Sequence, residues 1–194
     1  MTNPASLPGE NPRLTQSGLS RPFILLPLGL FTAVTVGLVA SMTVREPYDA
    51  PFPHLFFSDT LHMKAWLTTT ALLLALSQLL TASRIYGVLH FPPEGPFHNF
   101  AHRWLGRTAV LLTLPVASHC IFLLGFGTYS FRATIHSLLG SFLYGALVSK
   151  VLIVRSNGLR AWVLPVAGGL LFCIFAGLWL TSAFWFFRTF GLGS

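Results

Sequence analysis

Long uncharged stretches alternate with short polar segments along the chain. The uncharged stretches cover residues 23–42, 65–83, 108–131, 133–149 and 161–187. Each is near or above the roughly 17 residues that a helix needs to span a bilayer. In lipid the backbone polar groups of a spanning segment must pair within it, so helices are expected. The pattern therefore predicts an all-α integral membrane bundle of five transmembrane helices.

The segments between these stretches predict the domain organisation. Residues 1–20 are rich in Pro, Ser, Asn and Gly without an apolar period, so we expect a flexible tail before a transmembrane domain at 21–190. The linker 84–101 contains the run Pro92-Pro93-Glu94-Gly95-Pro96, which predicts an irregular conformation. The glycine-containing segment 125–132 predicts a turn between the third and fourth helices.

Composition narrows the class of protein further. Of the 194 residues, 53% are hydrophobic and 9% are charged, whereas a soluble domain has about 25% charged residues. This excludes a soluble enzyme and a disordered chain. The two cysteines, Cys120 and Cys173, both lie within apolar stretches and indicate neither a disulfide framework nor a zinc site. No CxxCH motif occurs, so c-type haem attachment is excluded.

The basic residues predict an orientation in the membrane. The net charge is +7, but the bases flank apolar stretches, which indicates membrane topology and no binding of nucleic acid. The side of the N-terminus carries eight of them and the other side carries Arg45, Lys64, Arg132 and Arg188. The excess predicts a cytoplasmic N-terminus in a multi-pass protein of the bacterial cytoplasmic (inner) membrane.

Histidines are the candidate chemical groups within the bilayer. All five acids lie outside the apolar stretches, which disfavours a transporter or channel built on carboxylates. His54, His90 and His98 lie in polar segments. The remaining four histidines lie in or at the mouth of an apolar stretch: His62, His102, His119 and His136.

Depth decides which of these histidines could meet. From a helical rise of about 1.5 Å per residue, His119 and His136 lie at similar depth in the outer half of the bilayer. His62 lies on the same side, nearer the surface, and His102 lies at the cytoplasmic mouth of the third helix. Two imidazoles at one depth can bind the iron of a porphyrin from both faces.

We therefore expect haem b with His119 and His136 as its axial metal ligands. The alternative ligand pair includes His62. In a non-functional interpretation, these histidines are buried and bonded to helix carbonyls. Arg132, Arg45 and Lys64 are the candidates to pair with the haem propionates. His102 has no evident histidine partner, and it could instead bind a lipid phosphate.

Small residues recur every four positions in the fourth predicted helix, at Ser137, Ser141, Gly145 and Ser149. Such a stripe lets another helix approach closely. The alternative is that the flat edge of a porphyrin lies against it.

Two short motifs resemble known haem proteins. His102-Arg103-Trp104-Leu105-Gly106 is similar to the signature of cytochrome b561 and to that of ferric-reductase-type membrane domains. Ile135-His136-Ser137-Leu138-Leu139-Gly140, which follows Arg132, is similar to the second cytochrome b561 signature. The resemblance covers roughly residues 60–155. The chain also resembles an uncharacterised family of small bacterial membrane proteins.

The resemblance implies haem b, bis-histidine ligation and electron transfer. It makes His102 and His136 ligands, with His62 the first histidine of an earlier helix, and it implies that Gly140 lets the porphyrin lie against its helix. Cytochrome b561 proteins have two histidine pairs, and this chain does not supply a clear second pair.

Two functions follow as hypotheses. The first is a membrane b-type cytochrome, an electron-transfer subunit that passes electrons between a quinol or partner subunit and a partner on the outer face. The second is a non-catalytic accessory or anchor subunit of a respiratory or photosynthetic complex. Its support is the small-residue stripe of the fourth helix together with the glycines and aromatic residues of the last stretch, which suit a surface for other membrane helices or pigments.

Overall fold

The computed structural model describes residues 22–44, 52–90, 96–156 and 159–191. All regular elements in these ranges are helices, and the described residues contain no strand. The helices are α1 (Pro22–Met42), α2 (Thr60–Ile85), α3 (Pro96–His119), α4 (Phe131–Arg155), α5 (Val163–Trp179) and α6 (Trp185–Phe190). Two short π-helical segments, η1 (Cys120–Leu124) and η2 (Leu180–Phe184), continue α3 and α5. The all-α prediction is confirmed.

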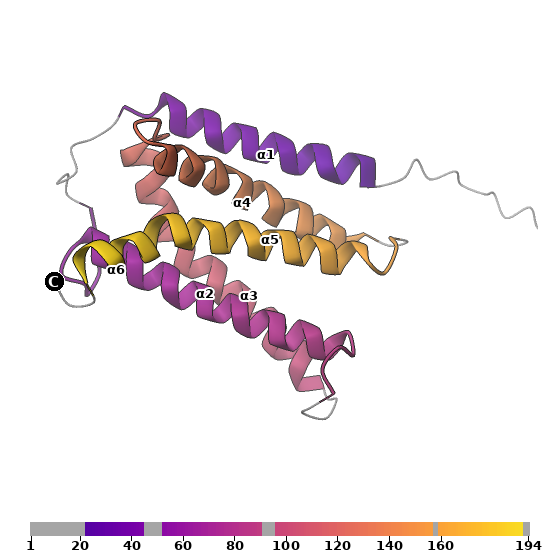
Figure 1. The fold of residues 1–194 in the computed structure, drawn as a ribbon. Helices are drawn as coiled ribbons and strands as arrows, with labels where there is room; N and C mark the ends of the chain where they lie inside the picture. The colour runs from indigo at the N-terminus through magenta and orange to yellow at the C-terminus, as the bar shows by residue number, and fades with distance from the viewer. Residues whose placement is uncertain (1–21, 45–51, 91–95, 157–158, 192–194) are drawn as a thin grey trace, which may run out of the picture.

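Within the described ranges, four continuous helical segments are long and apolar enough to cross a membrane: Thr60–Ile85, Phe97–Leu124, Phe131–Arg155 and Val163–Phe190. Each has at least 25 residues, or about 38 Å at 1.5 Å per residue, against a hydrocarbon core of about 30 Å. The fifth helix, α1, has 21 residues and runs alongside α4 (Figure 1). The chain is thus a helical membrane bundle. The cytoplasmic N-terminus stays a prediction, and the predicted tail at 1–20 lies outside the described residues.

The boundaries of α2 and α3 differ from the prediction. The linker 84–101 was expected to be irregular, but α3 begins at Pro96 and includes its last six residues. Proline is tolerated in the first turn of a helix, where its missing N–H would have no partner in any case. At the other end, α2 begins at Thr60 because the Asp59 carboxylate accepts hydrogen bonds from the N–H groups of Leu61 and His62, at 2.7 and 2.9 Å.

The helices form two close pairs. Helix α1 packs on α4, and α2 packs on α3. Helix α5 lies between the pairs and contacts both α2 and α4, while α3 and α4 stay apart although they are consecutive in the chain (Figure 1). This arrangement leaves space between α3 and α4. We call the end of the bundle where α2 and α4 begin the His136 end, and the opposite end the His102 end.

The small-residue stripe of α4 serves helix packing. A Cβ added at Gly145 would lie 2.5 Å from the carbonyl oxygen of Gly29 and 2.8 Å from Cβ of Ala33. A Cβ added at Gly29 would overlap the Ser149 side chain. The backbones of α1 and α4 are therefore close enough that only glycine fits at both positions. The packing interpretation holds for this part of the stripe.

Candidate functional site

A cavity of about 430 Å³ lies at the His136 end, in the space between α3 and α4. Residues of α1, the first turns of α2 and the segment from α5 through α6 complete its wall. Its volume is within the range of small-molecule and cofactor sites. Most lining side chains are apolar, and the few polar ones include Lys64, Thr113, Arg132, His136 and Tyr144. No Asp or Glu is among the lining residues that the structure describes.

His136 is the histidine that lines this cavity. It lies in the second turn of α4, whose start is fixed by the Ser130 hydroxyl, which accepts a hydrogen bond from the N–H of Ala133 at 3.2 Å. The Nδ1 atom of His136 is 3.0 Å from Oγ1 of Thr181. That hydroxyl donates its one hydrogen to the carbonyl of Gly177 or Leu178, at 2.9 and 3.0 Å.

The Thr181 hydroxyl has one hydrogen. When it donates that hydrogen to a backbone carbonyl, it accepts the bond from His136, and Nδ1 then carries the ring proton. In a neutral imidazole the lone pair is then on Nε2. Metal-ligating histidines are oriented in this way, with the second nitrogen donating to a protein acceptor. In this tautomer Nε2 of His136 carries no proton.

Both π-helical segments lie at this end of the bundle and line the cavity. Segment η2 carries Thr181, which binds the His136 ring and whose carbonyl accepts a hydrogen bond of 2.7 Å from Nη1 of Arg132. Segment η1 begins directly after His119, and the carbonyl of Ile121 within it accepts a bond from Thr43 of the segment that follows α1. π-helical turns frequently occur at functional sites. No sequence signal indicated either of them.

Two cations stand at the cavity wall. The Arg132 guanidinium lies 4.0 Å from the centre of the Trp185 ring, so a cation–π contact holds it in addition to its hydrogen bond. Nζ of Lys64 is 3.3 Å from Nδ1 of His119. These two basic groups make this end of the cavity attractive to an anion.

His119 lies beside the cavity and is not part of its wall. It is the last residue of α3, is buried, and its ring meets Phe52 edge to face with centroids 4.7 Å apart. The Lys64 ammonium contacts His119, and Lys64 and His136 both line the cavity. The two histidines predicted as an axial pair therefore lie at the same end of the bundle. His136 faces the cavity, whereas His119 faces Lys64.

Gly140 follows His136 by one turn and lines the cavity. A Cβ added at Gly140 would have one near contact, Cδ2 of Leu178 at 3.9 Å. The absent side chain leaves room beside His136.

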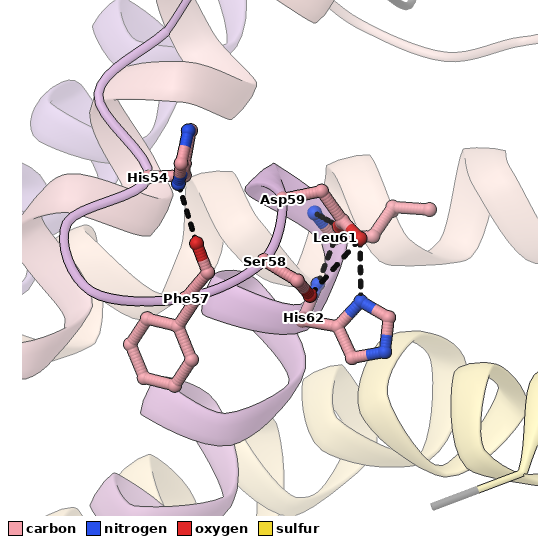
Figure 2. A network of polar contacts seen from close by, with 6 residues as sticks. All are labelled: His54, Phe57, Ser58, Asp59, Leu61 and His62. Atoms are coloured by element: carbon pink, nitrogen blue, oxygen red, sulfur yellow. Dashed lines mark hydrogen bonds and ion pairs between the residues drawn. The ribbon is translucent and has the colours of Figure 1, made fainter. Parts of the chain in front are cut away.

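His62 does not line the cavity. Its Nδ1 is 2.6 Å from Oδ2 of Asp59, and its ring meets Phe186 edge to face with centroids 5.0 Å apart. Figure 2 shows it beside the loop in which His54 Nδ1 lies 2.5 Å from the carbonyl oxygen of Phe57. Both histidines therefore belong to the structure that starts α2.

The Asp59 carboxyl lies at the start of α2, outside the apolar part of the bundle. Burial by itself raises its pKa, but the hydrogen bonds from the backbone and ring of His62 and from the N–H of Leu61 outweigh this, so that its pKa lies below the usual value. The carboxylate form is thus the one that caps the helix.

His102 lies at the opposite end of the bundle, as its position in α3 predicted. Its Nδ1 is 3.0 Å from Oγ1 of Thr81 and 3.2 Å from the carbonyl oxygen of Gln78, both in α2. The Gln78 amide in turn donates to the His102 carbonyl at 3.0 Å. A Cβ on Gly106, one turn further, would meet that Gln78 side chain at 2.4 Å. The motif from His102 to Gly106 thus packs α3 on α2.

Sequence reasoning missed Tyr144, which lines the cavity two turns after His136. Its hydroxyl is shielded from solvent and approaches Thr113 of α3, yet makes no hydrogen bond of good geometry with any described residue. The four-residue spacing of His136, Gly140 and Tyr144 is the signal that could have placed it on the same face. Thr181 has no such signal, because its role depends on how α5 packs against α4.

No group of three or more His, Cys, Asp or Glu side chains within the described ranges could hold a metal ion. A metal ion at His136 would therefore need ligand atoms other than a cluster of these side chains.

Residues 24–194 match the model of a family of unknown function, DUF6529. The chain belongs to DUF6529. None of the curated proteins and none of the solved structures matches it. The resemblance to cytochrome b561 thus stays a prediction from the two motifs, and function must be argued from the cavity.

Proposed function

We propose that this DUF6529 protein is a membrane b-type cytochrome that holds haem b in the cavity between α3 and α4. The observation that carries the proposal is His136, whose Nδ1 is bound to Thr181 and whose Nε2 is left as a ligand. In this proposal the protein lies in the bacterial cytoplasmic membrane and passes electrons between a quinol or a partner subunit and a partner on the outer face.

The residues present fit the group. The cavity offers apolar walls for the porphyrin, and Gly140 leaves room for it beside His136. Haem supplies its own four nitrogen donors, so the absence of a histidine and acid cluster among the described residues does not conflict with it. Arg132 and Lys64 supply the cations that two propionate groups require.

The chain's own residues would set the properties of the bound haem, which supplies the one-electron couple of iron. Thr181 keeps the His136 ring in one tautomer and orientation. The apolar wall keeps water away, and Arg132 and Lys64 place positive charge nearby. Axial ligand, burial and nearby charge are the means by which a protein sets a haem potential.

His119 is the proposed second axial ligand. To reach the cavity its ring would have to exchange its contact with Lys64 for one with the haem. Low-spin spectra of the wild type and high-spin spectra of His119→Ala would support this step, and unchanged low-spin spectra of the variant would assign the second position elsewhere.

A reduced-minus-oxidised absorption spectrum of the purified protein tests the proposal. We expect sharp α and Soret bands in the wild type and in His54→Ala, whose histidine lies in the exposed loop of Figure 2. His136→Ala should lose them. A wild type without bands after expression with haem supplied would contradict the proposal and favour the accessory-subunit hypothesis, and full bands in His136→Ala would exclude His136 as a ligand.

A further inference from the structure

The inner end of the cavity carries two hydroxyl groups that the haem proposal does not use. Tyr144 of α4 and Thr113 of α3 both line the cavity. At a helical rise of 1.5 Å per residue, Tyr144 follows His136 by about 12 Å, and Thr113 precedes His119 by about 9 Å. Because α3 ends and α4 begins at the His136 end, both residues lie deeper in the bundle than the histidines, at similar depth.

The Tyr144 hydroxyl has an unused hydrogen. Its oxygen is shielded from solvent and makes no hydrogen bond of good geometry with any described residue. A polar group in this position is costly to leave unpaired, and in native proteins such groups are paired with protein, water or a ligand. The cavity that Tyr144 lines is the space in which such a partner can bind. The hydroxyl can therefore donate a hydrogen bond to a molecule in the cavity.

The Thr113 hydroxyl supplies the complementary function. It donates its one hydrogen to the carbonyl of Val110 at 2.7 Å. While it makes this bond, its oxygen can only accept. The inner end of the cavity thus offers a hydrogen-bond donor on α4 and an acceptor on α3, and neither of them is charged.

The surroundings of these two hydroxyls select the chemistry of a ligand. The nearby lining side chains are apolar, and three of them belong to one packed cluster: Leu143, Phe175 and Leu178. Lys64 and Arg132, the charged residues among the described lining, lie at the His136 end. A charged headgroup at the inner end would therefore lose its hydration without a counter-charge, whereas an uncharged oxygen on an apolar ring would not.

We propose that Tyr144 and Thr113 bind an oxygen of a quinol headgroup at the inner end of the cavity. A quinone carbonyl accepts from Tyr144, and a quinol hydroxyl accepts from Tyr144 and also donates to Thr113. The inference rests on the proposed function, because it gives the quinol donor a place in the same cavity as the haem. Binding of the quinol itself requires no haem, so the two proposals can fail separately.

Calorimetric titration of decylbenzoquinone and decylbenzoquinol into the full chain in phosphatidylcholine nanodiscs tests the proposal, with haem supplied and without it. The wild type should bind both forms saturably. Tyr144→Phe should weaken the binding of both forms about three- to tenfold, which is the worth of one uncharged hydrogen bond. Thr113→Val should weaken the quinol to a similar degree and leave the quinone within about twofold, because a quinone has no hydrogen to donate.

Tyr86→Phe and Thr35→Val are the matched controls, because they make the same chemical changes outside the cavity. Tyr86 is exposed at the end of α2. The Thr35 hydroxyl donates to a carbonyl of its own helix, that of Phe31, at 2.9 Å, as Thr113 does. Both variants should bind quinone and quinol within about twofold of the wild type.

Three results would overturn the proposal. The first is a wild type without saturable binding, and the second is a Tyr144→Phe variant that binds both forms like the controls, or a Thr113→Val variant that treats the two forms alike. The third is displacement of the quinone by haem, since the two molecules would then occupy one space. The melting temperature of Tyr144→Phe separates lost binding from a damaged fold, because removal of an unpaired hydroxyl should raise it.

Discussion

Replacement of Gly145 by alanine tests the close contact of α1 and α4. The new Cβ would lie 2.5 Å from the carbonyl oxygen of Gly29, where ordinary contacts begin near 3.4 Å, so α1 must retreat by about 1 Å. Overpacking of this kind costs about 1–3 kcal/mol, and the better helix propensity of alanine returns up to about 1 kcal/mol. We therefore expect a net loss of about 1–2 kcal/mol.

Gly168→Ala is the matched control. Gly168 lies in α5, and a Cβ added there would meet nothing within 4 Å, so this variant gains the propensity of alanine without a clash. It should be stabilised by up to about 1 kcal/mol. The two variants thus share one chemical change, but the stability of one should fall and that of the other should rise.

Thermal unfolding in detergent micelles measures the difference. The stabilities of the two variants should differ by about 1–3 kcal/mol. For a chain of this size about 1 kcal/mol corresponds to roughly 2–4 °C, so the melting temperatures should differ by about 2–12 °C, with Gly145→Ala the lower. Equal melting temperatures, or a more stable Gly145→Ala, would refute the packing of α1 on α4 described above.

Three further substitutions test the cavity and the start of α2. Tyr144→Phe should raise the melting temperature by a few degrees, because it removes a buried hydroxyl without a good partner, which costs about 1–3 kcal/mol; a lower value would show that the hydroxyl is bonded. Thr181→Val should weaken haem binding by the apoprotein about 10–100-fold, because His136 loses its acceptor; an unchanged titration would reject that role. Since folding lowers the Asp59 pKa, the contribution of the carboxylate to stability is present above about pH 4 and is lost as the pH falls below this value. Between about pH 5 and 3, Asp59→Asn should therefore show a smaller loss of melting temperature than the wild type. Identical pH profiles of the two proteins would contradict this role of Asp59.

The sequence was sufficient for the helical architecture and for most of the spans, because lipid requires long apolar helices. It was insufficient at the start of α3, where the prolines of the linker suggested an irregular segment and Pro96 instead opens the helix. One proline within a run does not reveal whether it falls before a helix or in its first turn.

The candidate site was predictable in part. Helical rise placed His119 and His136 toward one end of the bundle, where Lys64 contacts His119 and lines the cavity with His136. The orientation of each ring was not predictable, since it depends on Thr181 for His136 and on Lys64 and Phe52 for His119. Such partners come from helices far apart in the sequence, and the spacing within one helix carries no information about them.

Chemical rescue of His136→Gly with imidazole measures the ligand role of His136 most directly. The variant should be purified without haem bands, and millimolar imidazole with added haem should restore a low-spin b-type spectrum, because free imidazole can occupy the space that the side chain leaves. Full haem binding by His136→Gly without imidazole would contradict a ligand role for His136. A wild type that binds no haem under the same conditions would contradict the proposed cytochrome itself.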